Sequence, residues 1–184
     1  MIPPAFPHDL GLKPRLHGEA LVFSALAAAL DESWHVFHDH AVAGTRRRVD
    51  FLCLSPARGI VAIEVKGGEV HLKRGGFRQR VRGDGTAKRI DPLAQVKAAT
   101  AAVLDALGAE LAPAPHLVMW LPMMSGEAFT FAERGREHFF TREQLAPAPL
   151  TTILDRVLVA TTPGEAHEIM RLIAGLGTRS PLTC

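Results

Sequence analysis

The stretch that decides the fold of this chain is residues 49–68, VDFLCLSPARGIVAIEVKGG. Two almost continuously apolar runs, 49–54 and 60–65, are separated by Ser-Pro-Ala-Arg, which is typical of a tight turn. The pattern predicts two strands joined as a hairpin. Strands that are apolar on both faces are covered on both faces, so we expect helices on each side of the sheet.

Three ionisable residues interrupt this predicted hairpin: Asp50, Glu64 and Lys66. Burying an unpaired charge costs roughly several kcal/mol, so they are expected to meet one another, a metal ion or a solvent-filled cleft. Glu64 and Lys66 are two residues apart on a strand and leave it on the same face. Two carboxylates suit a hard cation such as Mg²⁺, beside which a lysine can orient an attacking water. A plain salt bridge is the alternative.

Helices and further strands are predicted around the hairpin. Residues 16–30 form an amphipathic pattern, and Glu19 lies on its apolar stripe, pointing inward. Asp91 as N-cap and Pro92 at the first helical position begin a second helix that continues to Leu107. Further strands are expected at 34–39, 70–73, 77–82 and 116–121, and short helices at 142–146 and 162–174, with 150–160 ambiguous.

Length and composition indicate one folded domain. The chain has 184 residues, 47% of them hydrophobic and 22% charged. We expect a single domain over 1–174, with a core motif region at 17–121, a C-terminal helical part at 136–174 and a tail or linker at 175–184. Two cysteines exclude a disulfide framework and a four-cysteine zinc site. The longest apolar stretch, 21–30, is too short for a membrane span, so a cytoplasmic location is expected.

Basic residues are concentrated locally although the net charge is only +2. Residues 73–89 contain seven basic residues and one acid, and three consecutive arginines stand at 46–48. Such a patch attracts a polyanion, whereas a solvated arginine-rich edge strand is the alternative. The predicted DNA contacts are Arg46, Arg47, Arg48, Lys73, Arg74, Arg78, Arg80 and Arg82.

Several other residues are weaker candidates. His38 and His40 share a face of a predicted strand, but no third ligand has suitable spacing for zinc, and two exposed histidines are expected. Cys53 is expected to be a buried structural thiol. Gln95 shares a helix face with small residues, which favours an inward amide over a surface glutamine. Glu19 has the alternative of stabilising its helix through the helix dipole.

The order of these features resembles the nuclease-related domain (NERD) family, within the PD-(D/E)XK nuclease superfamily. The resemblance covers about 18–121 and is carried by Gly18-Glu19, an Asp that opens a buried strand, a strand ending in Glu-Val-Lys-Gly-Gly, a basic hairpin, and Asp91-Pro92 followed by Gln95. Phe77 stands near the hairpin where the family often has tryptophan. The last ~60 residues match nothing in the family pattern.

The resemblance implies an α/β, three-layer restriction-endonuclease-like fold with a mixed central β-sheet flanked by helices. It also implies that Asp50 and Glu64 are metal ligands, Lys66 the catalytic lysine, Glu19 an auxiliary acid and Gln95 a helix residue reaching into the site.

The expected function is Mg²⁺-dependent hydrolysis of DNA, with Mn²⁺ as a substitute cofactor, in DNA repair or defence against foreign DNA. A helicase is expected as a partner or a fused domain. Phosphate contacts carry no sequence information, so low sequence specificity is expected. The alternative is a non-catalytic nucleic-acid-binding or regulatory module.

Overall fold

The central sheet holds five strands in the order β1-β2-β3-β7-β8 among the residues that the structure, a computed structural model, describes. The described residues are 17–41, 45–67, 69–73, 76–80, 86–108, 116–121, 139–140, 147–158 and 160–177. The five strands are β1 (His35–Ala41), β2 (Arg48–Ser55), β3 (Gly59–Gly67), β7 (His116–Leu121) and β8 (Phe139–Phe140). β1, β2 and β3 are antiparallel neighbours, whereas β7 is parallel to β3 and β8 to β7. The sheet is therefore mixed, as expected.

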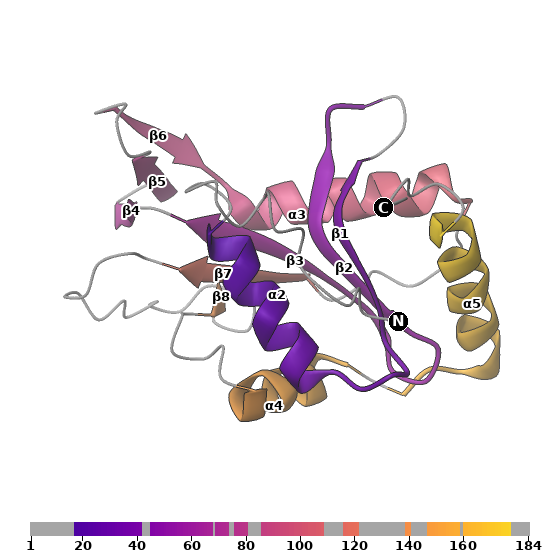
Figure 1. The fold of residues 1–184 in the computed structure, drawn as a ribbon. Helices are drawn as coiled ribbons and strands as arrows, with labels where there is room; N and C mark the ends of the chain where they lie inside the picture. Colours follow the sequence, from indigo (N-terminus) through magenta and orange to yellow (C-terminus); the bar gives the residue numbers. More distant parts are fainter. Residues whose placement is uncertain are drawn as a thin grey trace.

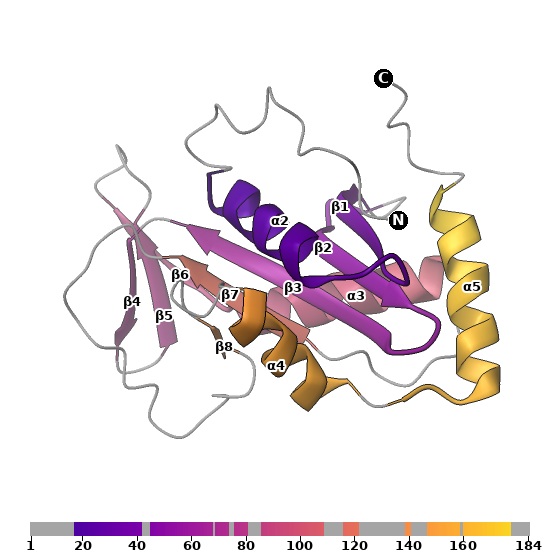
Figure 2. The ribbon, with the colours of Figure 1, turned by 60° about the horizontal axis from the view of Figure 1, so that its bottom comes forward.

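Helices cover both faces of the sheet (Figures 1 and 2). On one face α2 (His17–Ala29) and α4 (Pro147–Val157) pack their apolar side chains on Phe51 and Ile63. On the other face α3 (Pro92–Ala106) and α5 (Pro163–Gly177) pack on Leu52 and Ala62. The expected three-layer α/β architecture is confirmed.

The predicted starts of α3 and α5 are confirmed by their caps. The Asp91 carboxylate accepts the N–H of Ala94 at 3.0 Å, and Pro92 occupies the start of α3. At α5 the Glu165 carboxylate accepts the N–H of Thr162 at 2.8 Å, and the Thr162 hydroxyl accepts the N–H of Glu165 at 3.3 Å. These side-chain contacts satisfy backbone donors that have no partner within the helix.

The C-terminal third contributes to the core more than the sequence indicated. The ambiguous segment 150–160 is largely helix α4, and Leu150 is fully buried. The expected tail at 175–184 is wrong at its start, because α5 continues to Gly177 and buries Leu176 completely. The apolar spacing of Ile169, Leu172 and Leu176 keeps one face of α5 on the sheet through its last turn. The helix expected at 142–146 lies outside the described residues.

A small second sheet lies beyond the carboxyl end of β3 (Figure 1). It consists of β4 (Glu69–Lys73), β5 (Gly76–Arg80) and β6 (Ala87–Ile90), paired in antiparallel order. Two of these strands were expected, but β6 was not, because Ala-Lys-Arg-Ile contains only one residue, Ile90, of the β-branched and aromatic types that favour strands. In the described part of the chain, no helix combines the length and the apolarity that crossing a membrane requires.

Candidate active site

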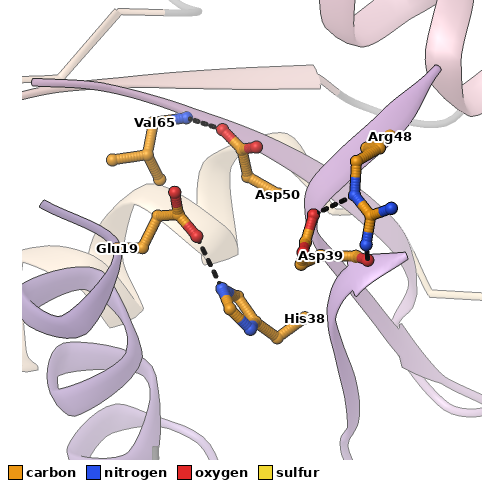
Figure 3. Close-up of polar contacts among 6 residues, drawn as sticks. All are labelled: Glu19, His38, Asp39, Arg48, Asp50 and Val65. Atoms are coloured by element: carbon orange, nitrogen blue, oxygen red, sulfur yellow. Dashed lines mark hydrogen bonds and ion pairs between the residues drawn. The ribbon is translucent and has the colours of Figure 1, made fainter. Parts of the chain in front are cut away.

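Asp50 and Glu64 lie next to each other where the β2–β3 ladder ends. The last paired residues in this direction are Phe51 and Ile63, so Asp50 and Glu64 occupy the next opposite positions. The Asp50 carboxylate accepts the N–H of Val65 at 2.7 Å, which replaces the backbone bond that the ladder would have supplied (Figure 3). The predicted approach of the two acids is thus produced by the register of one hairpin.

Lys66 forms an ion pair with Glu64. Its ammonium donates to Glu64 Oε1, and both side chains are largely buried. Ile63 and Val65 pack into the core that faces α2 and α4, so strand alternation places Glu64 and Lys66 on the opposite, α3 side. Glu64 is only 7% exposed, so this cation compensates part of the cost of burying its charge.

The surroundings of Asp50 and Glu64 disfavour the ionised forms of both carboxyl groups. Burial raises the pKa of Asp50 to about 7, the charge of Glu64 adds to this, and the hydrogen bond from Val65 opposes it. Burial likewise raises the pKa of Glu64, while Lys66 acts to lower it. The pKa of both carboxyl groups is therefore raised, and a bound cation would act to lower it.

Glu19 joins this cluster from α2. It lies on the inner face of the helix, as expected, and its charge acts to raise the pKa of both Asp50 and Glu64. Glu19 Oε2 lies 2.7 Å from His38 Nε2, and the other carboxylate oxygen is turned toward Asp50 (Figure 3). Three acids on α2, β2 and β3 thus share one electrostatic environment.

A local irregularity in β1 lies directly opposite Asp50. His38 pairs with Phe51 and His40 with Val49, which leaves Asp39 opposite Asp50 with no residue inserted in either strand. Asp39 has a positive φ of 49°. Arg48 pairs with its carboxylate, and Arg48 Nη2 donates to the Asp39 carbonyl oxygen at 2.6 Å. This clamp holds a backbone conformation that side-chain-bearing residues rarely adopt.

The irregularity corrects the prediction that His38 and His40 share a face. The His38 ring packs on Phe51, in the core facing α2, with ring centroids 4.9 Å apart. His40 instead contacts the ring of Phe37, which packs against the opposite core. Asp39, which has a positive φ and lies between the two histidines, places their side chains on opposite faces. The regular alternation of side chains along the strand is therefore interrupted at this point. The expected exposure is also wrong for His38, whose side chain is only 9% exposed.

The structure contradicts the inward amide expected of Gln95. Gln95 is exposed in the first turn of α3. The buried stripe of this helix runs through Pro92, Val96, Ala99 and Val103, and Gln95 lies at its edge rather than at its centre. The small residues next to it on the helix therefore cover the sheet while its own amide faces solvent.

The residues present fit a divalent cation through two carboxylates. Asp50 and Glu64 supply hard oxygen donors, and Mg²⁺ in proteins is commonly held by one or two carboxylates with water filling its other positions. In the part of the chain that the structure describes, no group of three His, Cys, Asp or Glu side chains is arranged to hold a metal ion. A site for a partly hydrated Mg²⁺ fits this donor set better than a closed zinc site does.

Of the basic residues predicted to contact DNA, some are exposed, some bond to other parts of the protein, and some lie outside the described residues. Arg78 and Arg80 are exposed on one face of β5, and Arg89 of β6 lies directly opposite Arg78. Like charges at opposite positions destabilise a sheet, so this face favours a bound polyanion. Arg47 donates to the carbonyl oxygen of Ala98 at 2.9 Å. Arg46 is exposed and Arg48 is clamped on Asp39, while Arg74, Arg82 and the side chain of Lys73 lie outside the described residues.

Comparison with known families bears on the first two thirds of the chain. The family model described as "NERD: Nuclease-related domain" matches residues 15–120, which is more than half of the chain. That span includes α2, the β2–β3 hairpin and α3, and therefore Glu19, Asp50, Glu64 and Lys66. No curated protein and no solved structure gives a significant match. Helices α4 and α5 lie beyond the matched span although their side chains complete both cores.

Proposed function

The chain belongs to the nuclease-related domain family, and on this premise we propose that it is a metal-dependent nuclease that hydrolyses DNA phosphodiester bonds with low sequence specificity. The observation that carries the proposal is the placement of Asp50 and Glu64 at opposite positions where the β2–β3 ladder ends, with Lys66 paired to Glu64 and with the pKa of both carboxyl groups raised by burial. Perturbed acids gathered with a lysine are typical of catalytic sites.

Each residue of the cluster has a separate role in this proposal. Asp50 and Glu64 hold Mg²⁺, or Mn²⁺ in its place. The bound cation would supply Lewis-acid chemistry, lowering the pKa of a water and polarising the phosphoryl group. Lys66, held against Glu64, orients the attacking water and offsets the negative charge that develops on the phosphate. Glu19 acts as the auxiliary acid that accepts a hydrogen bond from that water.

The charged surfaces next to the cluster would bind the DNA backbone. We propose that Arg78, Arg80 and the other predicted basic residues contact phosphates, together with Arg46, Arg47 and Arg48. Gln95, exposed at the start of α3, is proposed to contact the substrate rather than to lie within the protein. Contacts of this kind fix position on the strand and carry no base information, which is the basis for the proposed low specificity.

The test is a cleavage assay on the whole chain. Labelled plasmid, single-stranded DNA and RNA are incubated with Mg²⁺, with Mn²⁺ or with EDTA. Asp50→Asn, Glu64→Gln and Lys66→Ala are expected to abolish cleavage that the wild type shows with metal. Asp105→Asn, which changes an exposed acid on α3, is the matched control and is expected to retain it. Equal activity in the three site variants and the wild type would refute the assignment.

A second candidate is a non-catalytic nucleic-acid-binding or regulatory module. It is favoured by the basic face of the small sheet, where Arg78 and Arg89 lie directly opposite each other. It predicts salt-sensitive DNA binding with no cleavage in the presence of either metal.

For the cellular setting of the proposed nuclease we propose DNA repair or defence against foreign DNA in the cytoplasm, with a helicase as partner or fused domain.

A further inference from the structure

His38 is a buried polar residue beside the site, and the proposed chemistry does not use it. Its side chain is 9% exposed, and its Nε2 lies 2.7 Å from Glu19 Oε2. The tautomer of His38 that carries the proton on Nε2 donates this hydrogen bond to the Glu19 carboxylate. Packing on the Phe51 ring holds the imidazole plane, and Phe51 directly follows Asp50 in β2. The histidine, which lies on β1, is thus packed against β2, the strand that carries a proposed metal ligand.

The position of His38 depends on the irregular backbone at Asp39. Regular alternation would place His38 and His40 on one face, yet the left-handed Asp39 separates them. Backbone conformations of this kind cost about 1–3 kcal/mol and are concentrated at functional sites. Arg48 maintains it by contacting both the side chain and the carbonyl oxygen of Asp39. The result is one histidine turned to Glu19 and one turned to the opposite core.

The bond to His38 determines where the Glu19 carboxylate points. A glutamate has three side-chain torsions, so a position on the inner face of a helix does not by itself fix the direction of the carboxylate. Here one oxygen is held by His38, and the other is turned toward Asp50 (Figure 3). Glu19 is only 16% exposed in its side chain, so the hydrogen bond also compensates for the water that it lost.

We propose that His38 is a positioning residue: through Nε2 it fixes the Glu19 carboxylate so that the second oxygen is turned toward Asp50 and accepts a hydrogen bond from water there. This inference rests on the proposed nuclease function. His38 contacts neither substrate nor the reacting atoms and acts through Glu19. Loss of such a supporting partner typically lowers activity or metal affinity by about 10–100-fold.

The experiment uses five variants of the whole chain. His38→Phe keeps an aromatic ring on Phe51 and removes the donor, whereas His38→Gln places an amide nitrogen near the position of Nε2. His40→Phe is the matched control on the same strand, because His40 faces the opposite core. Glu19→Gln is made alone and combined with His38→Phe. The measurements are kcat and KM on labelled single-stranded DNA, Mn²⁺ affinity by calorimetry without DNA, and thermal unfolding.

We expect His38→Phe to lower kcat at least about tenfold and to weaken Mn²⁺ binding, with KM for DNA unchanged. His38→Gln should restore most of the loss, and His40→Phe should match the wild type. The double variant should be no slower than Glu19→Gln alone. His38 acts only through the Glu19 carboxylate, so Glu19→Gln already removes the effect of His38. Wild-type kinetics and Mn²⁺ affinity in His38→Phe, or losses that multiply in the double variant, would overturn the inference. A wild-type chain that neither binds Mn²⁺ nor cleaves DNA would instead refute the proposed function.

Discussion

Replacing Asp50 by Asn should make the metal-free protein more stable while abolishing cleavage. The amide oxygen of Asn can still accept the N–H of Val65, so the change removes the charge and keeps the hydrogen bond. Burial and the charge of Glu64 raise the pKa of Asp50 from 3.8 to about 7. At about 1.4 kcal/mol for each pH unit between the two values, ionised Asp50 costs the folded state on the order of 4 kcal/mol.

The sign of the pH dependence follows from proton binding. Between about pH 4 and pH 7 the folded carboxyl keeps its proton while the unfolded one loses it. The folded state binds more protons in this window, so the free energy of unfolding decreases as the pH rises through it. Above pH 7 the cost is fully present, and Asp50→Asn is free of it at every pH. The advantage of the variant should therefore grow from pH 4 to pH 8.

Urea unfolding in EDTA at pH 4, 6 and 8 measures this difference, with the fluorescence of buried Trp34 as the probe. At pH 8 we expect Asp50→Asn to be about 2–4 kcal/mol more stable than the wild type, which is roughly 5–10 °C in Tm for a chain of this size. Saturating Mg²⁺ should stabilise the wild type by about 2.7 kcal/mol at one hundred times its Kd and should stabilise the variant less. A variant that is equally stable or less stable at pH 8 in EDTA would refute the electrostatic reasoning. Asp105→Asn should show no such gain.

Three further predictions concern the lysine, the C-terminal helices and the basic sheet. Lys66→Met should lower the free energy of unfolding at pH 8, measured in urea, by about 3–5 kcal/mol, because it leaves the Glu64 carboxylate buried without its cation. Adding Glu64→Gln to this variant should recover most of the lost stability. Leu150→Ala should cost about 2–5 kcal/mol in the same assay, although Leu150 lies beyond the span that the family model matches, and exposed Met170→Ala should cost less than about 0.5 kcal/mol. Arg89→Ala should lower the slope of log K for DNA binding against log salt by about one, and an unchanged slope would remove the residue from the interface.

The sequence was most informative where local rules govern the structure. The hairpin of β2 and β3, with its charged residues at the open end, follows from apolar runs and one turn, and the helix starts at Asp91 and Thr162 follow from side-chain caps. Strands that are apolar on both faces must be covered on both faces, so the three-layer arrangement was also accessible from the sequence.

The errors arose where tertiary contacts override those rules. The alternation of side chains along a strand cannot predict the left-handed backbone conformation of Asp39. This conformation depends on a contact with Arg48, which lies on the neighbouring strand β2. The pairing of His38 with Glu19 was therefore hidden from the sequence. Gln95 was assigned to the buried stripe of α3 because its neighbours are small, yet the stripe is centred on Val96. Leu176 was placed in a tail because glycines flank it, although its spacing continues that of Leu172.

Asp50, Glu64 and Lys66 are carried by the two arms of a single hairpin, and this bears on the order in which the domain assembles. A ribosome releases these arms well before α4 and α5, whose side chains later close both faces. A cation held by the two acids would disfavour a one-residue slip between the strands while the nascent chain is still exposed to water. We expect Mg²⁺ to accelerate refolding as well as to serve the chemistry, and a refolding rate indifferent to Mg²⁺ would contradict this. The same ion would then act first as a guide for strand pairing and afterwards as a cofactor.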